Sequence, residues 1–129
     1  MQIIGLGTDI VEIDRIKEVV SRHTEHFKNR VYTADELLCA EKKNDQIAYL
    51  AGRWAAKEAA AKALGCGIGS SCALNDIEII NDAAGQPQLS FYGDAANTAE
   101  KLGVNDIKLS ISHEKHYAVA TVILCNKDD

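Results

Sequence analysis

RWAAKEAAAKAL, at residues 53–64, is the most informative stretch of this chain, and its alanines and leucine favour a helix. Glu58 and Lys62 stand four residues apart in it, so both side chains leave the same helical face. Such a pair can be an ordinary surface ion pair, or a carboxylate that holds a metal ion beside an ammonium that neutralises phosphate. Small residues around the pair allow another backbone or a ligand to approach closely. They are Ala55, Ala56, Ala59, Ala60, Ala61 and Ala63.

The predicted helix runs from residue 47 to residue 64, and Gly65 is its expected C-terminal cap. A glycine-rich turn follows it, GCGIGSS at residues 65–71. Turns of this composition can present backbone N–H groups to phosphate, but many of them only end a helix. Composition alone leaves both interpretations open.

A strand is predicted at residues 2–10, with Gly5 and Gly7 inside it. Glycine within a strand often marks a bulge or the close approach of another backbone. Asp9 falls at the C-terminal end of this strand, which is a common place for a functional side chain. An amphipathic helix is predicted next, at residues 14–22, because apolar residues recur there at helical spacing. They are Ile10, Ile13, Ile16, Val19 and Val20.

A capping box opens another predicted helix, in which the Thr33 hydroxyl caps the first turn and Glu36 reaches back. This helix should end near Lys42, before the long helix. The rest of the chain alternates strands with one helix. The predicted elements are strands at 77–80 and 89–92 around a turn at 82–87, a helix at 94–102 ended by Gly103, and a hairpin of strands at 107–112 and 117–124, with His113 at the edge of its tip.

This order of elements predicts an α+β fold, an antiparallel sheet with helices packed on it. The length of 129 residues and the absence of linkers or repeats predict a single domain, residues 1–129. No apolar run reaches the roughly 18 residues of a membrane helix, and the first residues lack the features of a signal peptide. The four cysteines form no C-x-x-C pair, so free thiols are expected and a zinc site is not. We therefore expect a cytoplasmic protein with no membrane attachment.

The net charge of −5 argues against a general nucleic-acid binder. The segment between residues 15 and 30 is locally basic, however, with an excess of three positive charges before its histidines are counted. This cluster can be a solvated helix face or a docking patch for an acidic partner. Its charged residues are Arg15, Lys17, Arg22, Lys28 and Arg30, against Glu18 and Glu25.

Three segments carry groups suited to chemistry: residues 7–9, the helix with Glu58 and Lys62, and residues 110–113. The chain has neither the glycine-flanked nucleophile of serine hydrolases nor a P-loop. The three segments in this order resemble the holo-[acyl-carrier-protein] synthase family, the small bacterial class of 4′-phosphopantetheinyl transferases. The matching stretches are IIGLGTDIVEIDRI (3–16), RVYTADE (30–36), RWAAKEAAAKALG (53–65) and KLSISHEKHYAVATVI (108–123).

Two residues depart from the family pattern. Tyr32 stands where a phenylalanine is expected, and Cys66 stands in the glycine-rich turn where a small polar residue is usual. Neither departure removes a group that the resemblance assigns to chemistry.

The resemblance implies transfer of the phosphopantetheine arm of coenzyme A to a serine of acyl carrier protein, with release of adenosine 3′,5′-bisphosphate. It implies a Mg²⁺ ion held by Asp9 and Glu58, which agrees with the preference of Mg²⁺ for one or two carboxylates plus substrate phosphates and water. Lys62 is implied to meet the diphosphate and offset charge on the leaving group. Glu58, or a metal-bound water held by Asp9, is the candidate base for the acceptor serine, and the sequence does not choose between them.

The resemblance also implies which residues hold the coenzyme. Ser112 and His113 should face its phosphates, Arg53 is a candidate partner of its 3′-phosphate, and the turn with Gly65 and Gly67 should lie along it. Homotrimers with active sites between subunits are implied, so that His113 would come from the neighbour of the subunit that supplies Asp9 and Glu58.

An acidic carrier protein as partner favours the docking interpretation of the basic segment, with Arg15 and Arg22 foremost. The implied pathway is fatty acid biosynthesis, within lipid metabolism. Two rival functions remain: a Mg²⁺-dependent transferase that acts on another nucleotide diphosphate, and a non-catalytic module that binds coenzyme A.

Overall fold

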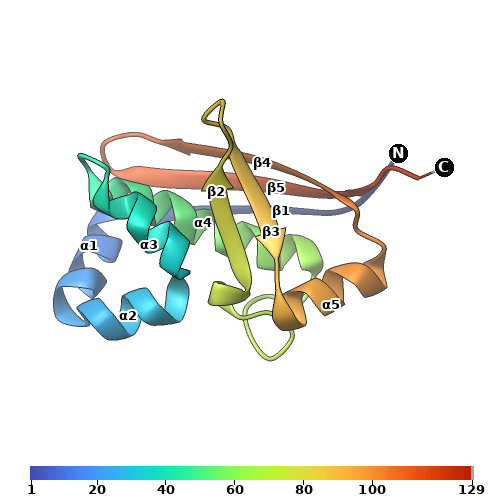
Figure 1. Cartoon of the computed structure of the whole chain (residues 1–129), viewed down its shortest axis with the longest axis horizontal. Coiled ribbons are helices and arrows are strands. Elements are labelled where there is room, and N and C mark those ends of the chain that lie inside the picture. The colour runs from blue at the N-terminus through green and yellow to red at the C-terminus, as the bar shows by residue number, and fades with distance from the viewer. Residues whose placement is uncertain (129) are drawn as a thin grey trace.

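The computed structural model of the chain describes residues 1–128. Its strands and helices alternate irregularly along the sequence (Figure 1). In order they are β1 (Gln2–Glu12), α1 (Ile13–Arg22), α2 (Thr24–Val31), α3 (Ala34–Glu41), α4 (Gln46–Leu64), the short 3₁₀ helix η1 (Leu74–Asp76), β2 (Ile77–Asn81), β3 (Pro87–Phe91), α5 (Gly93–Leu102), β4 (Asp106–His113) and β5 (Tyr117–Asn126). None of the helices within residues 1–128 is long and apolar enough to cross a membrane.

The α+β class predicted from the sequence is confirmed, but the strands form two sheets instead of one. Strands β1, β5 and β4 make an antiparallel sheet in that order, with β5 in the centre. Strands β2 and β3 form a separate antiparallel hairpin that runs across the long strands (Figure 1). The β2–β3 and β4–β5 hairpins are each joined by a short polar turn, whereas β1 pairs with β5 from the other end of the chain.

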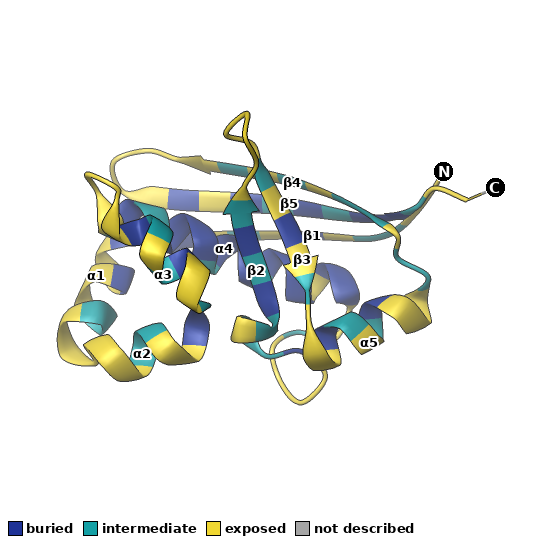
Figure 2. Ribbon diagram, viewed as in Figure 1, coloured by how far each residue is buried: buried dark blue, intermediate teal, exposed yellow. Residues whose placement is uncertain are grey.

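Helix α4 forms the centre of the molecule and is buried along most of its length (Figure 2). The alanines of the predicted small-residue helix are almost inaccessible, and buried side chains of β5 complete the core on the same side of the large sheet. These strand residues are Ala118, Ala120, Val122 and Leu124. The core therefore brings the large sheet directly onto the helix that carries Glu58 and Lys62.

Glycines in β1 let the strand backbone touch the helix backbone. A Cβ atom added to Gly7 would lie 1.9 Å from the carbonyl oxygen of Ala59, and one added to Gly5 would lie 1.9 Å from that of Ala63. Side chains cannot occupy such distances, so only glycine allows this contact. The close approach expected from the alanines and glycines is confirmed, and the partner of the helix is the β1 backbone.

Local signals placed most elements within about two residues of their observed ends. The capping box is present: Glu36 N donates to Thr33 Oγ1 at 3.3 Å, and Thr33 N donates to Glu36 Oε1 at 2.9 Å. Gly65 ends α4 in the left-handed conformation, with φ of 83°. Helix α2 and η1 were missed, because the sequence of α2 is mostly polar and buries only Val31.

A buried ion pair links α4 to α3, η1 and β2. Lys57 and Glu36 are both inaccessible, and Lys57 Nζ lies 2.7 Å from Glu36 Oε1. The same ammonium donates to the carbonyl oxygens of Leu74 and Ile77, while Glu36 Oε2 accepts from Ile79 N at 2.8 Å. Because its polar atoms are paired, the network can stay buried at a tolerable cost and hold α3, η1 and β2 against α4.

Candidate functional site

Asp9, Glu58 and Lys62 line one cavity of about 440 Å³ between β1, α1, α2 and α4. Asp9 lies on the face of β1 that meets α4, because it is two residues beyond Gly7 and strand side chains alternate between faces. Glu58 and Lys62 reach the same cavity from successive turns of α4. The three residues that the sequence assigned to chemistry are therefore brought together by the contact of the strand with the helix.

Lys62 pairs with the strand carboxylate. Its Nζ lies 2.9 Å from Asp9 Oδ1 and 3.1 Å from the carbonyl oxygen of Thr8. The lysine side chain is half exposed while that of Asp9 is mostly buried, so the ammonium reaches inward from the rim of the cavity. The ordinary surface ion pair between Glu58 and Lys62 that the spacing allowed is not the contact that forms.

The second carboxylate lies in an unfavourable electrostatic position. Burial raises the pKa of Glu58, the negative charge of Asp9 raises it further, and Lys62 acts in the opposite direction. Two carboxylates that repel each other therefore share one cavity, whose charged lining also includes Lys62 and Arg15. This arrangement is suited to a hard cation that takes oxygen ligands.

No group of three or more His, Cys, Asp or Glu side chains within residues 1–128 is arranged to hold a metal ion. In the cavity of Lys62, the acidic side chains within residues 1–128 are the two carboxylates of Asp9 and Glu58. This number fits Mg²⁺, which is commonly bound through one or two carboxylates, with water and substrate phosphates as the other ligands.

Arg53 and His113 line a different cavity of about 290 Å³, together with Tyr49 and Asn81. Arg53 is 6% exposed, and its guanidinium lies 4.2 Å from the centre of the Tyr49 ring. Its Nη2 donates to Asn81 Oδ1 at 2.9 Å, while its Nε is buried without a hydrogen-bond partner. A fixed, partly unsatisfied guanidinium is suited to an anionic group that enters the cavity.

Ser112 and His113 are neighbours in β4 but lie on opposite faces of the sheet. His113 is opposite the buried Ala118, and Ser112 is opposite the exposed Val119. Within one chain, the structure therefore places His113 near Arg53 and directs Ser112 to the face of the sheet away from α4.

The glycine-rich turn follows α4 as predicted, but its first N–H groups are already used. Gly65 N donates to Lys62 O at 3.0 Å, and Gly67 N donates to Ala61 O at 3.1 Å. Both glycines have positive φ, 83° and 65°. These two hydrogen bonds end helix α4, which agrees with the interpretation of the turn as a helix stop. A phosphate bound at this turn would have to use other N–H groups.

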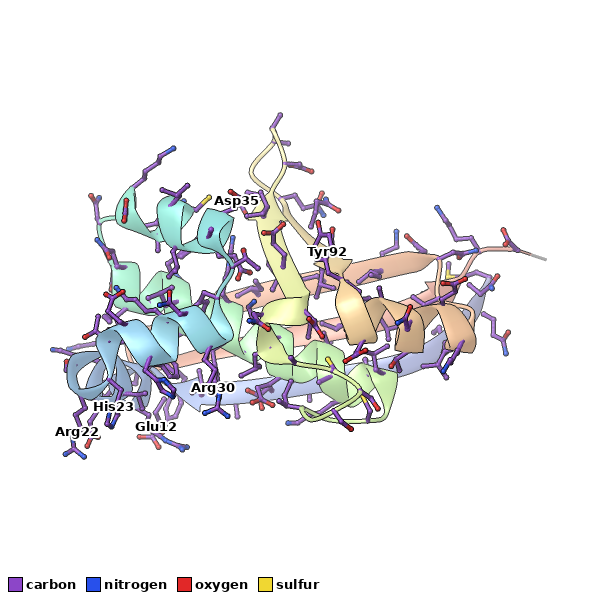
Figure 3. All side chains as sticks on the ribbon, turned by 60° about the horizontal axis from the view of Figure 1, so that its bottom comes forward. Glu12, Arg22, His23, Arg30, Asp35 and Tyr92 are labelled. Carbon is purple, nitrogen blue, oxygen red and sulfur yellow. The ribbon has the colours of Figure 1, made fainter. Side chains whose placement is uncertain are left out.

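The two arginines expected to meet the partner occupy different positions. Arg15 lines the cavity of Asp9 and Glu58. Arg22 is exposed at the end of α1 and pairs with Glu18 at 2.9 Å. Figure 3 shows Arg22 and Arg30 on the same side of the molecule, so positive groups extend from the cavity outward over α1 and α2.

An apolar wall of the first cavity was not anticipated. Val19, Phe27 and Trp54 line it, and the rings of Phe27 and Trp54 are stacked with centroids 5.8 Å apart. Trp54 precedes Glu58 by four residues, the spacing that already linked Glu58 to Lys62. That spacing could have identified Trp54, whereas Phe27 lies on the helix that was missed.

Comparison with known proteins identifies the family. Residues 5–122 match the model of the 4′-phosphopantetheinyl transferase superfamily. The chain belongs to this superfamily. The resemblance found in the sequence motifs is therefore confirmed, and the cavity of Asp9, Glu58 and Lys62 lies within the matched part of this phosphopantetheinyl transferase.

Relatives of the transferase are similar over nearly their whole length. It is 49% identical over 124 residues to a holo-[acyl-carrier-protein] synthase of Salmonella arizonae, covering 96% of this chain and 95% of that protein. It is 49% identical to that of Vibrio parahaemolyticus, covering 96% and 98%. Each likeness therefore concerns a whole protein of similar size.

Solved structures agree with the fold. The holo-[acyl-carrier-protein] synthase of Neisseria meningitidis matches with a TM-score of 0.89 and 35% identity, covering 96% of this chain and 99% of that one. That of Bacillus anthracis, in complex with CoA (3′,5′-ADP), matches with a TM-score of 0.82 and 36% identity, covering 98% and 100%.

Proposed function

We propose that this chain is a holo-[acyl-carrier-protein] synthase. It transfers the 4′-phosphopantetheine group of coenzyme A to a serine of apo acyl carrier protein and releases adenosine 3′,5′-bisphosphate. The observation that carries the proposal is the convergence of Asp9, Glu58 and Lys62 on one cavity in a chain of this superfamily. Synthases of similar length, with 48–49% identity, support the choice of substrate pair.

The chain's own groups supply what phosphoryl transfer requires. The Lys62 ammonium offsets negative charge that builds on the leaving diphosphate oxygen, and its exposed position at the cavity rim lets it shift from Asp9 to a phosphate. The acceptor serine has to lose a proton as it attacks. Glu58, whose pKa is raised by burial and by Asp9, is the candidate to accept that proton directly.

Dependence on Mg²⁺ is a further part of the proposal, with Asp9 and Glu58 as its protein ligands. Their oxygen donors, their shared cavity and their mutual repulsion fit a divalent cation. When bound, the ion would withdraw charge from the phosphoryl group and position it.

The coenzyme contacts are proposed to come from two subunits. The cavity of Asp9 and Glu58 shares no lining residue with the cavity of Arg53 and His113 in the same chain. Strand β1 also exposes Leu6 and Ile10, each about two thirds accessible, next to Asp9. Apolar side chains at this place are suited to burial by another subunit. We infer a homotrimer in which Arg53 and His113 of one subunit complete the site of its neighbour.

The partner surface is proposed to be the docking helix, α1 with Arg15 and Arg22. Positive groups between the cavity and the end of α1 would guide an acidic carrier protein toward the reacting phosphate, despite the negative net charge of the enzyme. We further propose, from the family resemblance, that this reaction belongs to fatty acid biosynthesis and takes place in the cytoplasm.

Intact-protein mass spectrometry of an apo acyl carrier protein tests the activity. The carrier is incubated with the chain, coenzyme A and Mg²⁺, and parallel reactions contain EDTA or the Glu58→Gln variant. The expected result is a mass gain of one phosphopantetheine group that both controls abolish. A gain that persists in EDTA would overturn the metal requirement alone.

Failure to modify any carrier protein would overturn the transferase assignment. Calorimetric titration with coenzyme A then separates the two rivals. Binding without turnover indicates a non-catalytic coenzyme module, and no binding indicates an enzyme for another nucleotide diphosphate.

A further inference from the structure

Two of the four cysteines meet beside the C-terminal end of α4. Cys66 follows the capping glycine and is exposed, whereas Cys72 is fully buried at the end of the glycine-rich turn. Both are free thiols, like Cys39 and Cys125. No assigned role in the transfer reaction uses either thiol.

Backbone contacts fold the turn so that the two side chains approach each other. Gly69 and Cys72 form a two-way bridge, with Gly69 N to Cys72 O at 2.8 Å and Cys72 N to Gly69 O at 3.2 Å. Cys66 Sγ lies 4.0 Å from the carbonyl oxygen of Ala61, on the last turns of α4. The Cys66 thiol lies near enough to Cys72 to contribute to the raised pKa of the Cys72 thiol.

The backbone around Cys66 has room to adjust. Gly65 and Gly67 flank it with positive φ, and a Cβ on either of them, or on Gly69, would meet no atom within 4 Å. A disulfide requires specific separation and torsion of the two cysteines, which a rigid backbone often cannot provide. Here three glycines within five residues, 65–69, allow the exposed partner to move toward the buried one.

We propose that Cys66 and Cys72 are a redox modification site that closes to a disulfide when the protein meets a peroxide. The Cys66 thiol releases its proton, the thiolate attacks one peroxide oxygen, the O–O bond breaks, and the sulfur becomes a sulfenic acid as hydroxide leaves and takes up the released proton to form water. The Cys72 sulfur then attacks the Cys66 sulfur, the S–O bond breaks, and the departing hydroxide takes the Cys72 proton as a second water. The two sulfurs lose two electrons to the peroxide, and a dithiol reductant reverses the change.

The environments of the two thiols set their order of reaction. Burial raises the pKa of Cys72 to about 12, with contributions from Cys66 and Asp76. A buried thiol that keeps its proton is a poor first nucleophile, whereas the exposed Cys66 is accessible to the oxidant. Cys66 therefore reacts first and Cys72 resolves the intermediate.

Closure of this disulfide is expected to slow the transfer reaction, a consequence that rests on the proposed function. Cys66 follows Lys62 by four residues, and Cys72 lies within electrostatic reach of Glu58. A covalent link between them fixes the turn that ends the catalytic helix and restricts its adjustment to the coenzyme.

The test treats the full-length chain with hydrogen peroxide, blocks remaining thiols, and maps the peptides by mass spectrometry without reduction. We expect a Cys66–Cys72 cross-linked peptide, short of two hydrogen atoms, that dithiothreitol removes. The variants Cys66→Ser and Cys72→Ala should lack it, and Cys39→Ser should retain it. Peptides in which Cys66 carries only sulfinic or sulfonic acid, with Cys72 still reduced, would overturn the proposal.

Transfer activity is measured on the same oxidised samples, each relative to its own reduced form. The expected result is a loss of at least half of the activity in the wild type and Cys39→Ser, restored by dithiothreitol, with a smaller loss in Cys66→Ser. A disulfide without loss of activity would overturn the regulatory consequence alone. Inactivity of the reduced wild type would instead count against the proposed function and leave the peptide map valid.

Discussion

Lys62 Nζ lies 2.9 Å from Asp9 Oδ1, so an ammonium of helix α4 holds a carboxylate of strand β1. Glu58 lines the same cavity, but the ion pair of Lys62 is with Asp9 and not with Glu58. The trio carries two negative charges and one positive charge when all three are ionised. Burial and the charge of Asp9 raise the pKa of Glu58, so a proton or a cation at Glu58 stabilises the cavity, and removal of this carboxylate should do the same.

Replacing Glu58 by Gln should stabilise the chain against heat at neutral pH in EDTA. The folded-state pKa of Glu58 is raised above its ordinary value of 4.5, so ionised Glu58 opposes folding and its cost appears as pH rises through that value. We expect an increase in Tm on the order of 2–4 °C at pH 8, limited by the partial exposure of the group. The increase should be much smaller at pH 4, below the ordinary pKa of 4.5, where Glu58 is mostly protonated in both states. Calorimetry measures both, and an equal effect at the two pH values would contradict this explanation.

Replacing Gly7 by Ala should destabilise the whole fold. The new Cβ would lie 1.9 Å from Ala59 O, so β1 and α4 must separate. We expect a loss of about 3 kcal/mol or more in the free energy of unfolding, from overpacking of a backbone contact. Gly69→Ala is the matched control, because its Cβ meets no atom within 4 Å and its φ is not positive. Similar denaturation midpoints for the two variants would contradict the role of Gly7.

Replacing Lys57 by Met should leave the buried carboxylate of Glu36 without its charged partner. Removal of one member of a fully buried pair costs about 3–5 kcal/mol, because the remaining charge is uncompensated. The double variant Glu36→Leu/Lys57→Met should recover part of that loss. Urea denaturation of the wild type, Lys57→Met and the double variant measures these changes in the free energy of unfolding. A Lys57→Met variant as stable as the wild type would refute the stabilising role of the buried ion pair.

Replacing Arg22 by Glu should weaken recognition of the carrier protein only. The side chain is exposed on the docking helix and lies outside the cavity of Glu58. We expect the KM for carrier protein to rise about tenfold, equivalent to ~1.4 kcal/mol, while the KM for coenzyme A stays nearly unchanged. Lys101→Glu, a charge reversal on α5, serves as the control. An equal rise in both KM values would refute docking by Arg22.

Mixing two inactive variants should restore activity if the sites lie between subunits. Glu58→Gln and His113→Ala each remove one half of the proposed site, and their cavities are separate within a chain. After unfolding and joint refolding, random assembly of equal amounts in a closed ring should give about a quarter of wild-type activity. Each variant refolded alone provides the baseline. Activity that stays at this baseline would place both residues in the site of a single chain.

The elements that could be predicted from the sequence are those fixed by neighbouring residues. Thr33 with Glu36, Gly65 and Gly103 act within one turn of their own helices, and the structure confirms all of them. The division of the strands into two sheets depends on contacts between distant segments, which no local pattern contains. Helix α2 has only one buried residue, so its sequence lacks the apolar periodicity that identified α1.

The site was predicted unevenly for the same reason. The four-residue spacing placed Glu58 and Lys62 together, but residue chemistry alone would not have brought Asp9 to them. The family resemblance supplied that link, and its physical cause is the contact of Gly7 with Ala59. Lys57 was overlooked because a lysine beside a functional glutamate looks like a surface residue, although it points into the core.

The junction of β1 with α4 has a consequence for how this protein can evolve. The polar face of α1 meets solvent while Ile13 and Ile16 are buried, so substitutions on the polar face can change partner choice at little structural cost. Gly5 and Gly7 carry no reactive group, yet a single added methyl at either one would push the two carboxylates apart. The geometry of the site therefore depends on two positions that contribute only by lacking a side chain. Substitutions of Gly5 and Gly7 should accordingly be eliminated by selection.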